Sequence, residues 1–248
     1  MITSRQNGQV KAWIKLNRKK EREKTGLFIA EGFHLVEEAI KSQMSIKELI
    51  ISEKLNNDLP NYTNGYPQTV ISDELSNEIA DTETPQGIFA VVEMPKQSNQ
   101  LHSKVLLLDQ VQDPGNLGTI IRSADAAGFT QVICGEGTVD PYNAKVLRSG
   151  QGSHFHVDIQ SADLNEYISK LKRQSIPVYG TDLSKDSIDY KTVCPKDKVA
   201  IIVGNEGSGV NKELLELVDG TLHVPIKGQA ESLNVAVAAS ILMFHLSN

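Results

Sequence analysis

Three polar segments rich in glycine, asparagine and serine constrain the fold of this chain more than any other feature. They span residues 113–124 (DPGNLGTIIRSA), 203–210 (VGNEGSGV) and 224–234 (VPIKGQAESLN). Each joins an apolar, strand-like run to a run with the pattern of a helix. In an α/β fold such junctions lie at the carboxyl ends of strands, where ligands bind. Three of them in one half of the chain therefore predict a single composite site.

The C-terminal half alternates between strand-like and helix-like runs. Apolar runs such as KVLLLD and KVAIIVG show no alternation with polar residues, which indicates strands covered on both faces, as in a parallel sheet with helices on either side. The expected strands are residues 105–108, 131–134, 178–180, 199–203 and 221–224. The expected helices are residues 117–127, 143–149, 164–175, 212–218 and 233–246. The predicted fold class is therefore α/β with a parallel sheet.

The N-terminal part predicts a second, smaller α/β domain. Its helical patterns lie at residues 4–20 and 32–40. Its strand-like runs lie at residues 28–30, 46–52, 69–71 and 88–92. The polar stretch 94–103 (MPKQSNQLHS) has the composition of a linker. We therefore predict one domain at residues 1–94 and a second at residues 104–248.

Charge is distributed unevenly along the chain. The 248 residues carry a net charge of −6, but residues 1–24 hold eight basic and two acidic side chains. That segment is +6, so the remainder carries −12. A basic N-terminal helix on an acidic body can be a footprint for phosphates. It can also be a solvated helix face, which a charge run by itself favours.

Neither a membrane span nor a metal site is expected. The N-terminus shows no cleavable apolar signal region, and the apolar stretch 235–246 is too short to cross a bilayer, which predicts a cytoplasmic protein. Cys134 and Cys194 form no CxxC pair, so we expect buried thiols rather than a disulfide or metal ligands. No metal-ligand spacing is present among His154, His156, His223 and His245.

The first junction carries an asparagine and an arginine. Asn116 is expected to cap the helix that follows it. Arg122 lies among apolar and small neighbours (LGTIIRSADAAGF), where a guanidinium requires a carboxylate or an anionic ligand. An ion pair with Asp125 and a phosphate contact are equally consistent with this pattern.

The second and third junctions argue against two common nucleotide sites. Glu206 lies among glycines, and its carboxylate would repel a phosphate, so the loop suits a hydroxyl, an amine or an arginine instead. Neither the P-loop pattern nor the complete dinucleotide fingerprint occurs in the chain. In the third junction, Ser232 is expected to cap the last helix, with Asn234 in its first turn. That helix has almost no polar face and is expected to be buried nearly all round.

Taken in order, the polar residues of the junctions resemble a known set of motifs. The chain has N-x-G-x-x-x-R from Asn116 to Arg122, N-E-x-x-G from Asn205 to Gly209, and P-x-x-G followed by S-L-N from Pro225 to Asn234. This set resembles the SpoU/TrmH family of RNA ribose 2′-O-methyltransferases, in the SPOUT superfamily, over residues 104–246. The segment FIAEGFHLVEEAI (residues 28–40) is similar to the family's substrate-binding domain, which is like ribosomal protein L30e.

The resemblance implies a specific fold and set of partners. The C-terminal domain would carry a trefoil knot in its parallel sheet, with a smaller L30e-like domain before it. The knot would bind S-adenosylmethionine, and two copies would pair through the knotted domains. Contacts to the cofactor are implied for Thr181, Gly204, Val224, Ile226 and Leu233. The catalytic set implied is Arg122, often from the partner subunit's side of the site, with Asn116, Glu206, Ser232 and Asn234 around it.

The predicted function is methyl transfer from S-adenosylmethionine to a ribose 2′-hydroxyl of RNA, with ribosomal RNA favoured. Three alternatives stay open on the sequence. The first is a transfer RNA 2′-O-methyltransferase, and the second is a noncatalytic RNA-binding member of the same fold. The third is a nucleotide-dependent oxidoreductase on a Rossmann sheet, which the missing glycine fingerprint disfavours.

Overall fold

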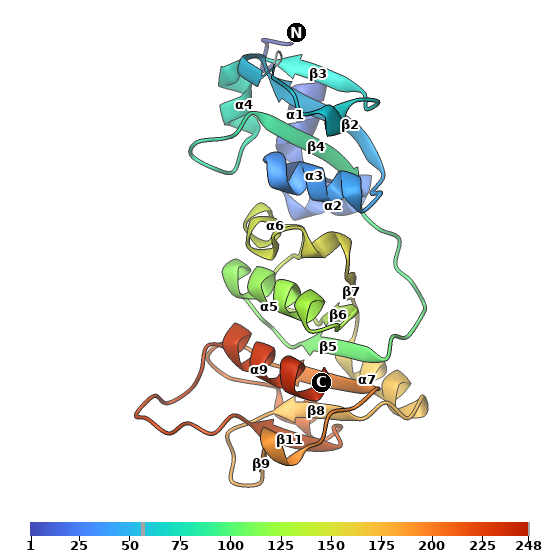
Figure 1. The fold of residues 1–248 in the computed structure, drawn as a ribbon, viewed down its shortest axis with the longest axis vertical. Helices are drawn as coiled ribbons and strands as arrows, with labels where there is room; N and C mark the ends of the chain where they lie inside the picture. The colour runs from blue at the N-terminus through green and yellow to red at the C-terminus, as the bar shows by residue number, and fades with distance from the viewer. Residues whose placement is uncertain (56–57, 248) are drawn as a thin grey trace. The chain divides into compact units, whose positions relative to one another are not determined.

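The computed structural model describes residues 1–55 and 58–247, which divide into two compact units (Figure 1). Unit 1 comprises Met1–Lys96 and Tyr142–Phe155, and unit 2 comprises the rest of the described chain. The segment 142–155, which we predicted within the C-terminal domain, therefore packs in unit 1. Periodicity shows that a helix has a buried face, but it does not show which part of the chain covers that face.

Unit 1 is a four-stranded sheet with helices on both faces. The strand order is β1-β4-β2-β3; β4 runs antiparallel to both neighbours, and β2 and β3 are parallel. Its elements are α1 (Gly8–Lys15), α2 (Lys19–Thr25), β1 (Leu27–Glu31), α3 (Phe33–Lys41), β2 (Ile46–Ser52), η1 (Glu53–Leu55), η2 (Asn61–Thr63), β3 (Gln68–Ile71), α4 (Asp73–Ile79), β4 (Ile88–Glu93), α6 (Ala144–Gly150) and η3 (Ser153–Phe155). Side chains of α1 and α4 pack on one face, and those of α3 and α6 pack on the other. The predicted small α/β domain is thus confirmed in architecture.

The first helix is interrupted where we predicted one continuous helix. α1 ends at Lys15 and α2 begins at Lys19, with Arg18 between them in an extended conformation. The guanidinium of Arg22 is buried, and its Nη1 donates to the carbonyl oxygen of Leu16 at 2.6 Å. Because this bond runs from α2 to the end of α1, it holds the two helices in a defined arrangement.

Unit 2 contains a seven-stranded sheet in the order β7-β6-β5-β10-β8-β11-β9, and every pairing in it is parallel. Val105 and Leu107 of β5 pack with α7, and the alternate residues Leu106 and Leu108 are also fully buried. The predicted parallel sheet with both faces covered is therefore confirmed. The elements are β5 (Lys104–Leu108), α5 (Pro114–Ala126), β6 (Gln131–Cys134), β7 (Asp158–Ser161), α7 (Leu164–Arg173), β8 (Val178–Thr181), β9 (Ile188–Asp189), η4 (Tyr190–Thr192), β10 (Val199–Val203), α8 (Lys212–Leu215), β11 (Gly220–His223) and α9 (Val235–Ser247).

Sequence patterns missed two strands, which form the edges of this sheet. β7 has the sequence DIQS and β9 has the sequence ID, so neither carries the apolar run that marks a strand. Cys194, expected to be buried, is exposed, whereas Cys134 in β6 is buried as predicted. Within residues 1–55 and 58–247, no helix has the length and apolar character that crossing a bilayer requires.

The last helix, α9, is not buried all round as we predicted. Val237 and Phe244 are 48% and 45% exposed, and Ile241 between them is half-buried. Residues four and seven positions apart share one face of a helix, so these three side chains form an apolar stripe. A helix that is apolar on every side carries no periodicity, and its sequence therefore cannot show which face is buried.

The strand order brings the three polar junctions together. β10 lies between β5 and β8, and β11 lies on the other side of β8. Because all these strands are parallel, their carboxyl ends meet at one edge of the sheet. From β11 the chain crosses back through residues 224–234 to α9, which packs against α5 and β10. The loops after β5, β8, β10 and β11 thus surround one place.

Candidate functional site

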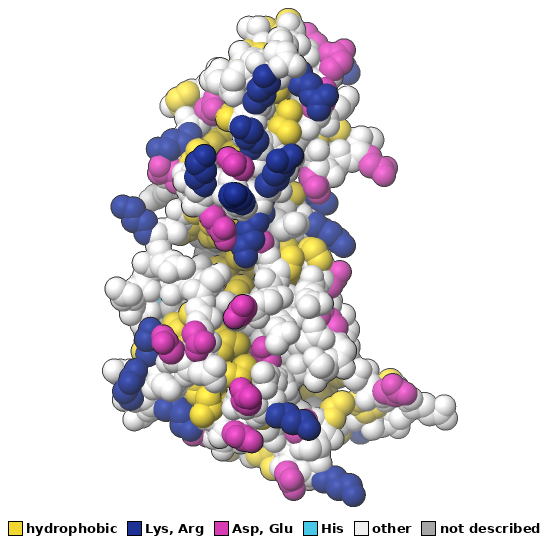
Figure 2. Space-filling view, turned by 180° about the vertical axis from the view of Figure 1, so that it is seen from behind, with side chains coloured by type: hydrophobic (Ala, Val, Ile, Leu, Met, Phe, Trp, Pro, Cys, Tyr) yellow, Lys and Arg dark blue, Asp and Glu magenta, His cyan; other side chains and the backbone are white. Residues whose placement is uncertain are grey.

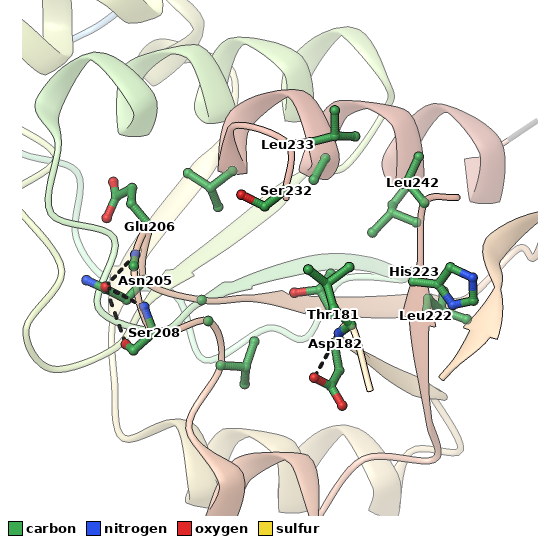
Figure 3. Close-up of a pocket in the computed structure, with 18 of the residues that line it drawn as sticks. Thr181, Asp182, Asn205, Glu206, Ser208, Leu222, His223, Ser232, Leu233 and Leu242 are labelled. Carbon is green, nitrogen blue, oxygen red and sulfur yellow. Dashed lines mark hydrogen bonds between the residues drawn. The ribbon is translucent and has the colours of Figure 1, made fainter. Parts of the chain in front are cut away.

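A cavity of about 310 Å³ lies at the carboxyl edge of β8, β10 and β11 (Figure 3). Its walls come from residues 181–183, 204–210, 222–226, 232–233 and the first turns of α9. The five residues that we predicted as cofactor contacts all line it, namely Thr181, Gly204, Val224, Ile226 and Leu233. The structure therefore brings this predicted set together, and its role in binding a cofactor is a proposal.

The loop after β10 folds back on itself directly above Gly204. Asn205 and Gly209 exchange backbone hydrogen bonds at 3.0 Å each, and a Cβ at position 204 would overlap the backbone of Gly209 and Val210. The side-chain oxygen of Asn205 accepts from the backbone nitrogen of Gly207 at 2.9 Å. Gly204 thus allows a contact between two stretches of backbone that any side chain would prevent.

Glu206 projects from this loop toward the start of α5. Its carboxylate accepts hydrogen bonds from the backbone nitrogens of Gln112 at 3.2 Å and Asp113 at 3.1 Å, and from Nδ2 of Asn116 at 3.0 Å. Partial burial opposes its charge, but these hydrogen bonds outweigh burial and hold the pKa of the Glu206 carboxyl below its ordinary value. Glu206 is therefore ionised at neutral pH and acts only as an acceptor.

An ionised Glu206 determines the orientation of two side-chain amides. Asn116 must turn its Nδ2 toward Glu206, so its Oδ1 faces Asn234, whose Nδ2 donates to it at 2.8 Å. At the other end, Oδ1 of Asn234 accepts from the backbone nitrogen of Ala236 at 2.9 Å, which requires the same orientation. Each amide retains one N–H that this chain of hydrogen bonds does not use. The rim thus presents hydrogen-bond donors in a defined direction.

Two helix caps differ from our predictions. Asp113, not Asn116, caps α5, and its Oδ1 accepts from the backbone nitrogen of Asn116 at 2.8 Å. Asn234, not Ser232, bonds the free N–H groups at the start of α9. Ser232 instead lines the cavity, and its hydroxyl makes no hydrogen bond within the part of the chain that the structure describes (Figure 3).

Arg122 is the one predicted catalytic residue that lies apart from this cluster. It is exposed on α5, two turns beyond Asn116, and it does not line the cavity. Among residues 1–55 and 58–247 its guanidinium has no hydrogen bond and no ion pair. The predicted alternative of an ion pair with Asp125 is wrong, because Asp125 contacts Nδ1 of His156 at 2.9 Å. An arginine without a protein partner is suited to binding an anionic ligand.

The walls of the cavity combine apolar side chains with carboxylates. Leu222, Val224 and Leu242 form an apolar surface, and Asp182 and Glu206 place negative charge at the lining. Such a cavity suits a ligand with a flat apolar ring and a positive charge, and it does not suit a phosphate. No group of three or more metal-ligating side chains is found in the described part of the chain.

Our sequence analysis missed two polar residues of the site. Asp182 follows β8 directly, so the rule that ligands bind at the carboxyl ends of parallel strands could have identified it. Asn205 closes the loop around Gly204, and its Nδ2 also donates to the carbonyl oxygen of Gln110 at 2.9 Å. Its motif signalled a turn, but the partner at Gln110 follows only from the pairing of β5 with β10.

We expect Glu206→Gln to lower turnover by up to about 100-fold, because it misorients the donors at the rim. A glutamine presents an N–H where Asn116 and two backbone nitrogens already donate, so Asn116 loses its orientation. The affinity for a ligand held by the cavity walls should change much less. Turnover and ligand affinity, measured separately, test this. Glu213→Gln on α8 is the matched control, and an equal loss in both variants would contradict the role of Glu206.

The chain matches two known families over most of its length. Residues 103–244 match the SpoU rRNA methylase family, and residues 7–90 match the MRM3-like substrate binding domain. The chain is 49% identical over 247 residues to the 23S rRNA (guanosine(2553)-2′-O)-methyltransferase of Bacillus subtilis, covering 99% of this chain and 98% of that protein.

Solved structures show the same architecture. The AdoMet-bound rRNA methyltransferase from Sinorhizobium meliloti is 33% identical, with a TM-score of 0.86 over 99% of this chain and 96% of that one. The SpoU methyltransferase AviRb from Streptomyces viridochromogenes, in complex with AdoMet, is 25% identical, with a TM-score of 0.87 over 98% and 97%. These likenesses confirm the predicted fold class, a trefoil-knot α/β unit together with a smaller α/β unit.

Proposed function

We infer that this chain, which belongs to the SpoU rRNA methylase family, methylates a ribose 2′-hydroxyl of ribosomal RNA with S-adenosylmethionine as the donor. The observation that carries this assignment is the convergence of the three junctions on one cavity. Its rim holds the hydrogen-bonded chain of Glu206, Asn116 and Asn234. Transfer forms a bond between the 2′-oxygen and the methyl carbon, breaks the bond from sulfur to that carbon, and releases the hydroxyl proton.

The cavity fits S-adenosylmethionine in shape and charge. Leu222, Val224 and Leu242 would enclose the adenine ring, and Gly204 leaves the backbone of its loop accessible. Asp182 and Glu206 would balance the positive charges of the donor. When bound, the donor supplies a methyl group activated by a sulfonium, and the chain's own residues must supply position and charge stabilisation.

The protein's contribution to the reaction is positioning and hydrogen-bond donation. Glu206 orients Asn116, and Asn116 orients Asn234, so their unused N–H groups can hold oxygen atoms of the substrate. The hydroxyl of Ser232 lies at the same cavity. These three groups would hold the target ribose beside the donor.

Arg122 would bind the phosphate next to the target ribose and stabilise the negative charge that develops on the 2′-oxygen. An arginine keeps its proton under ordinary conditions, so a role as anchor fits its chemistry better than a role as base. Its position outside the cavity lining suits a site completed by a second copy, in which Arg122 of one subunit serves the cavity of its partner.

We propose a homodimer that pairs through the apolar stripe of α9. Val237, Ile241 and Phe244 form this stripe, and exposed apolar patches of this kind mark interfaces. The variant Phe244→Glu should be monomeric by sedimentation and should lose most of its turnover while keeping its fold. Leu217→Glu, at another apolar residue that is 36% exposed, is the control and should leave the dimer intact. A dimeric Phe244→Glu variant would show that the subunits pair elsewhere.

The target that we propose is a guanosine in 23S rRNA, by analogy with the Bacillus subtilis relative, in the cytoplasm. Mapping 2′-O-methyl groups in RNA from cells with and without this protein tests it. One site in large-subunit RNA should be lost, and it should return when the purified protein and S-adenosylmethionine are added to that RNA.

Other outcomes of this mapping would identify the alternatives. Loss of a site in transfer RNA alone would identify a transfer RNA methyltransferase. Binding of S-adenosylmethionine by calorimetry, with no methyl group lost in cells, would identify a noncatalytic RNA-binding protein. Binding of a nicotinamide cofactor instead would favour an oxidoreductase.

A further inference from the structure

Five exposed cations on α1 and α2 have no carboxylate partner. They are Lys11, Lys15, Arg18, Lys20 and Lys24, which we call the α1–α2 basic face. None of their side chains makes an ion pair or hydrogen bond within residues 1–55 and 58–247. Figure 2 shows lysine and arginine side chains gathered on the upper part of the molecule, where Figure 1 places α1 and α2.

Other lysines of unit 1 are neutralised locally. Lys41 pairs with Glu37 and Glu38 at 3.0 and 3.1 Å. Lys47 pairs with Glu93, and Lys54 pairs with Asp73. These three are as exposed as ordinary surface lysines, with 53% to 78% of each side chain accessible. The basic face therefore differs from the rest of its own unit in its uncompensated charge.

Helix stability does not account for this arrangement. Lysines in a last turn favour the helix dipole, which would explain Lys15 and Lys24 but not Lys11, Arg18 or Lys20. Lys11 and Lys15 are four residues apart on α1, and Lys20 and Lys24 are four residues apart on α2. Like charges at this spacing destabilise an isolated helix. The charges thus oppose local stability and call for an external anion.

The basic face also stands on a rigid base. Val10, Trp13 and Leu16 anchor α1 in the core of unit 1, and Nε1 of Trp13 donates to Glu48 at 2.9 Å. The buried guanidinium of Arg22 joins α2 to the end of α1 through Leu16. A surface held in this way keeps its spacing without an ordering cost on binding.

We propose that the α1–α2 basic face is a docking surface for the phosphate backbone of the RNA substrate. The partner is RNA because the proposed reaction brings RNA to this chain, so the inference rests on the proposed function. Its contacts are to phosphates and are therefore independent of base sequence. The face holds the RNA by its backbone, while the cavity of unit 2 acts on the target ribose.

The test compares two triple variants of equal charge. The first carries Lys11→Gln, Lys15→Gln and Lys20→Gln on the basic face. The control carries Lys41→Gln, Lys47→Gln and Lys54→Gln, which removes three lysines that are already paired. Affinity is measured between about 0.05 and 0.2 M salt. The probes are a labelled 23S rRNA fragment around the guanosine named for the Bacillus subtilis relative, and a scrambled fragment of equal length.

The basic-face variant should bind both fragments at least about tenfold more weakly at low salt. Its plot of log affinity against log salt should be shallower than wild type by about 2 to 3, since each phosphate contact contributes about 0.7 to 0.9. Affinity for S-adenosylmethionine and kcat at saturating RNA should stay near wild type, with only KM raised. The control should match the wild-type protein in every measurement.

Several results would overturn the proposal. Equal weakening in both variants would show a general charge effect, and no weakening in either would show that RNA binds elsewhere. Loss of binding to phosphatidylserine vesicles with RNA affinity retained would assign the face to a membrane. A failure of the proposed function looks different, because the wild-type protein would then methylate no ribosomal RNA whatever its affinity.

Discussion

Replacing Gly204 with alanine is expected to abolish binding of S-adenosylmethionine and to destabilise unit 2. The new Cβ would overlap the backbone of Gly209 and Val210, so neither a rotamer change nor a flexible neighbour can relieve the clash. Overpacking of this kind costs about 3 kcal/mol. The loop of residues 205–209 must open, and it carries Glu206 with it. Calorimetry with S-adenosylmethionine and urea unfolding measure the two effects.

Gly207→Ala is the matched control in the same loop. Its added Cβ would lie 3.5 Å from Oδ1 of Asn205, which is an ordinary contact. This variant should keep its unfolding midpoint and most of its affinity for S-adenosylmethionine. If the alanine at position 204 bound the donor as tightly as wild type, the closed loop would not be part of the site.

Arg122→Ala is expected to lower kcat by about 10² to 10³, the usual effect of removing one charge-stabilising donor. Because Arg122 is exposed and makes no ion pair or hydrogen bond with the described residues, stability and affinity for S-adenosylmethionine should not change. Arg122→Lys keeps the charge but loses the two-pronged geometry, so its turnover should lie between. Near-normal turnover in the alanine variant would rule out both an anchor and a base.

Mixing two inactive variants tests whether Arg122 serves the partner's site. In a heterodimer of Arg122→Ala and Glu206→Gln, one site would carry both changes and the other would carry neither. Random pairing would then restore up to about a quarter of wild-type turnover. If both residues act within one subunit, every site in the mixture carries one change and no recovery occurs.

The hydrogen-bonded chain also has a pH dependence with a definite sign. The pKa of Glu206 in the folded protein is lower than the ordinary value of about 4.3. Its contribution to stability is therefore complete above that value and is lost as the pH falls through the lower folded pKa. Between pH 6 and 9 Glu206 stays ionised, so it adds nothing to the pH dependence of turnover there.

Local signals identified most elements of unit 2, because its central strands are uniformly apolar. The predicted bounds of β6 and β10 agree with the structure at both ends. The start of α5 was missed by three residues, although Pro114 after Asp113 is a typical first helical position after a cap. That error arose from choosing between two good caps, and the sequence held the information to decide it.

Other errors could not have been avoided from the sequence. Ser232 and Asn234 both have capping side chains, and only the contact from Asn234 to Asn116 favours one over the other. The helix α6 shows an apolar face, but nothing in its pattern assigns it to unit 1. Nor could a uniformly apolar α9 show that Phe244 stays exposed.

The amino-acid sequence by itself determined where strands end, which polar side chains follow them, and the motifs that connect this chain to its family. Tertiary structure decided that β10 lies between β5 and β8, which sets Glu206 beside Asn116 and Asn116 beside Asn234. The physical reason is that side-chain periodicity reports whether a face is buried, whereas the choice of partner depends on pairing between segments about 90 residues apart.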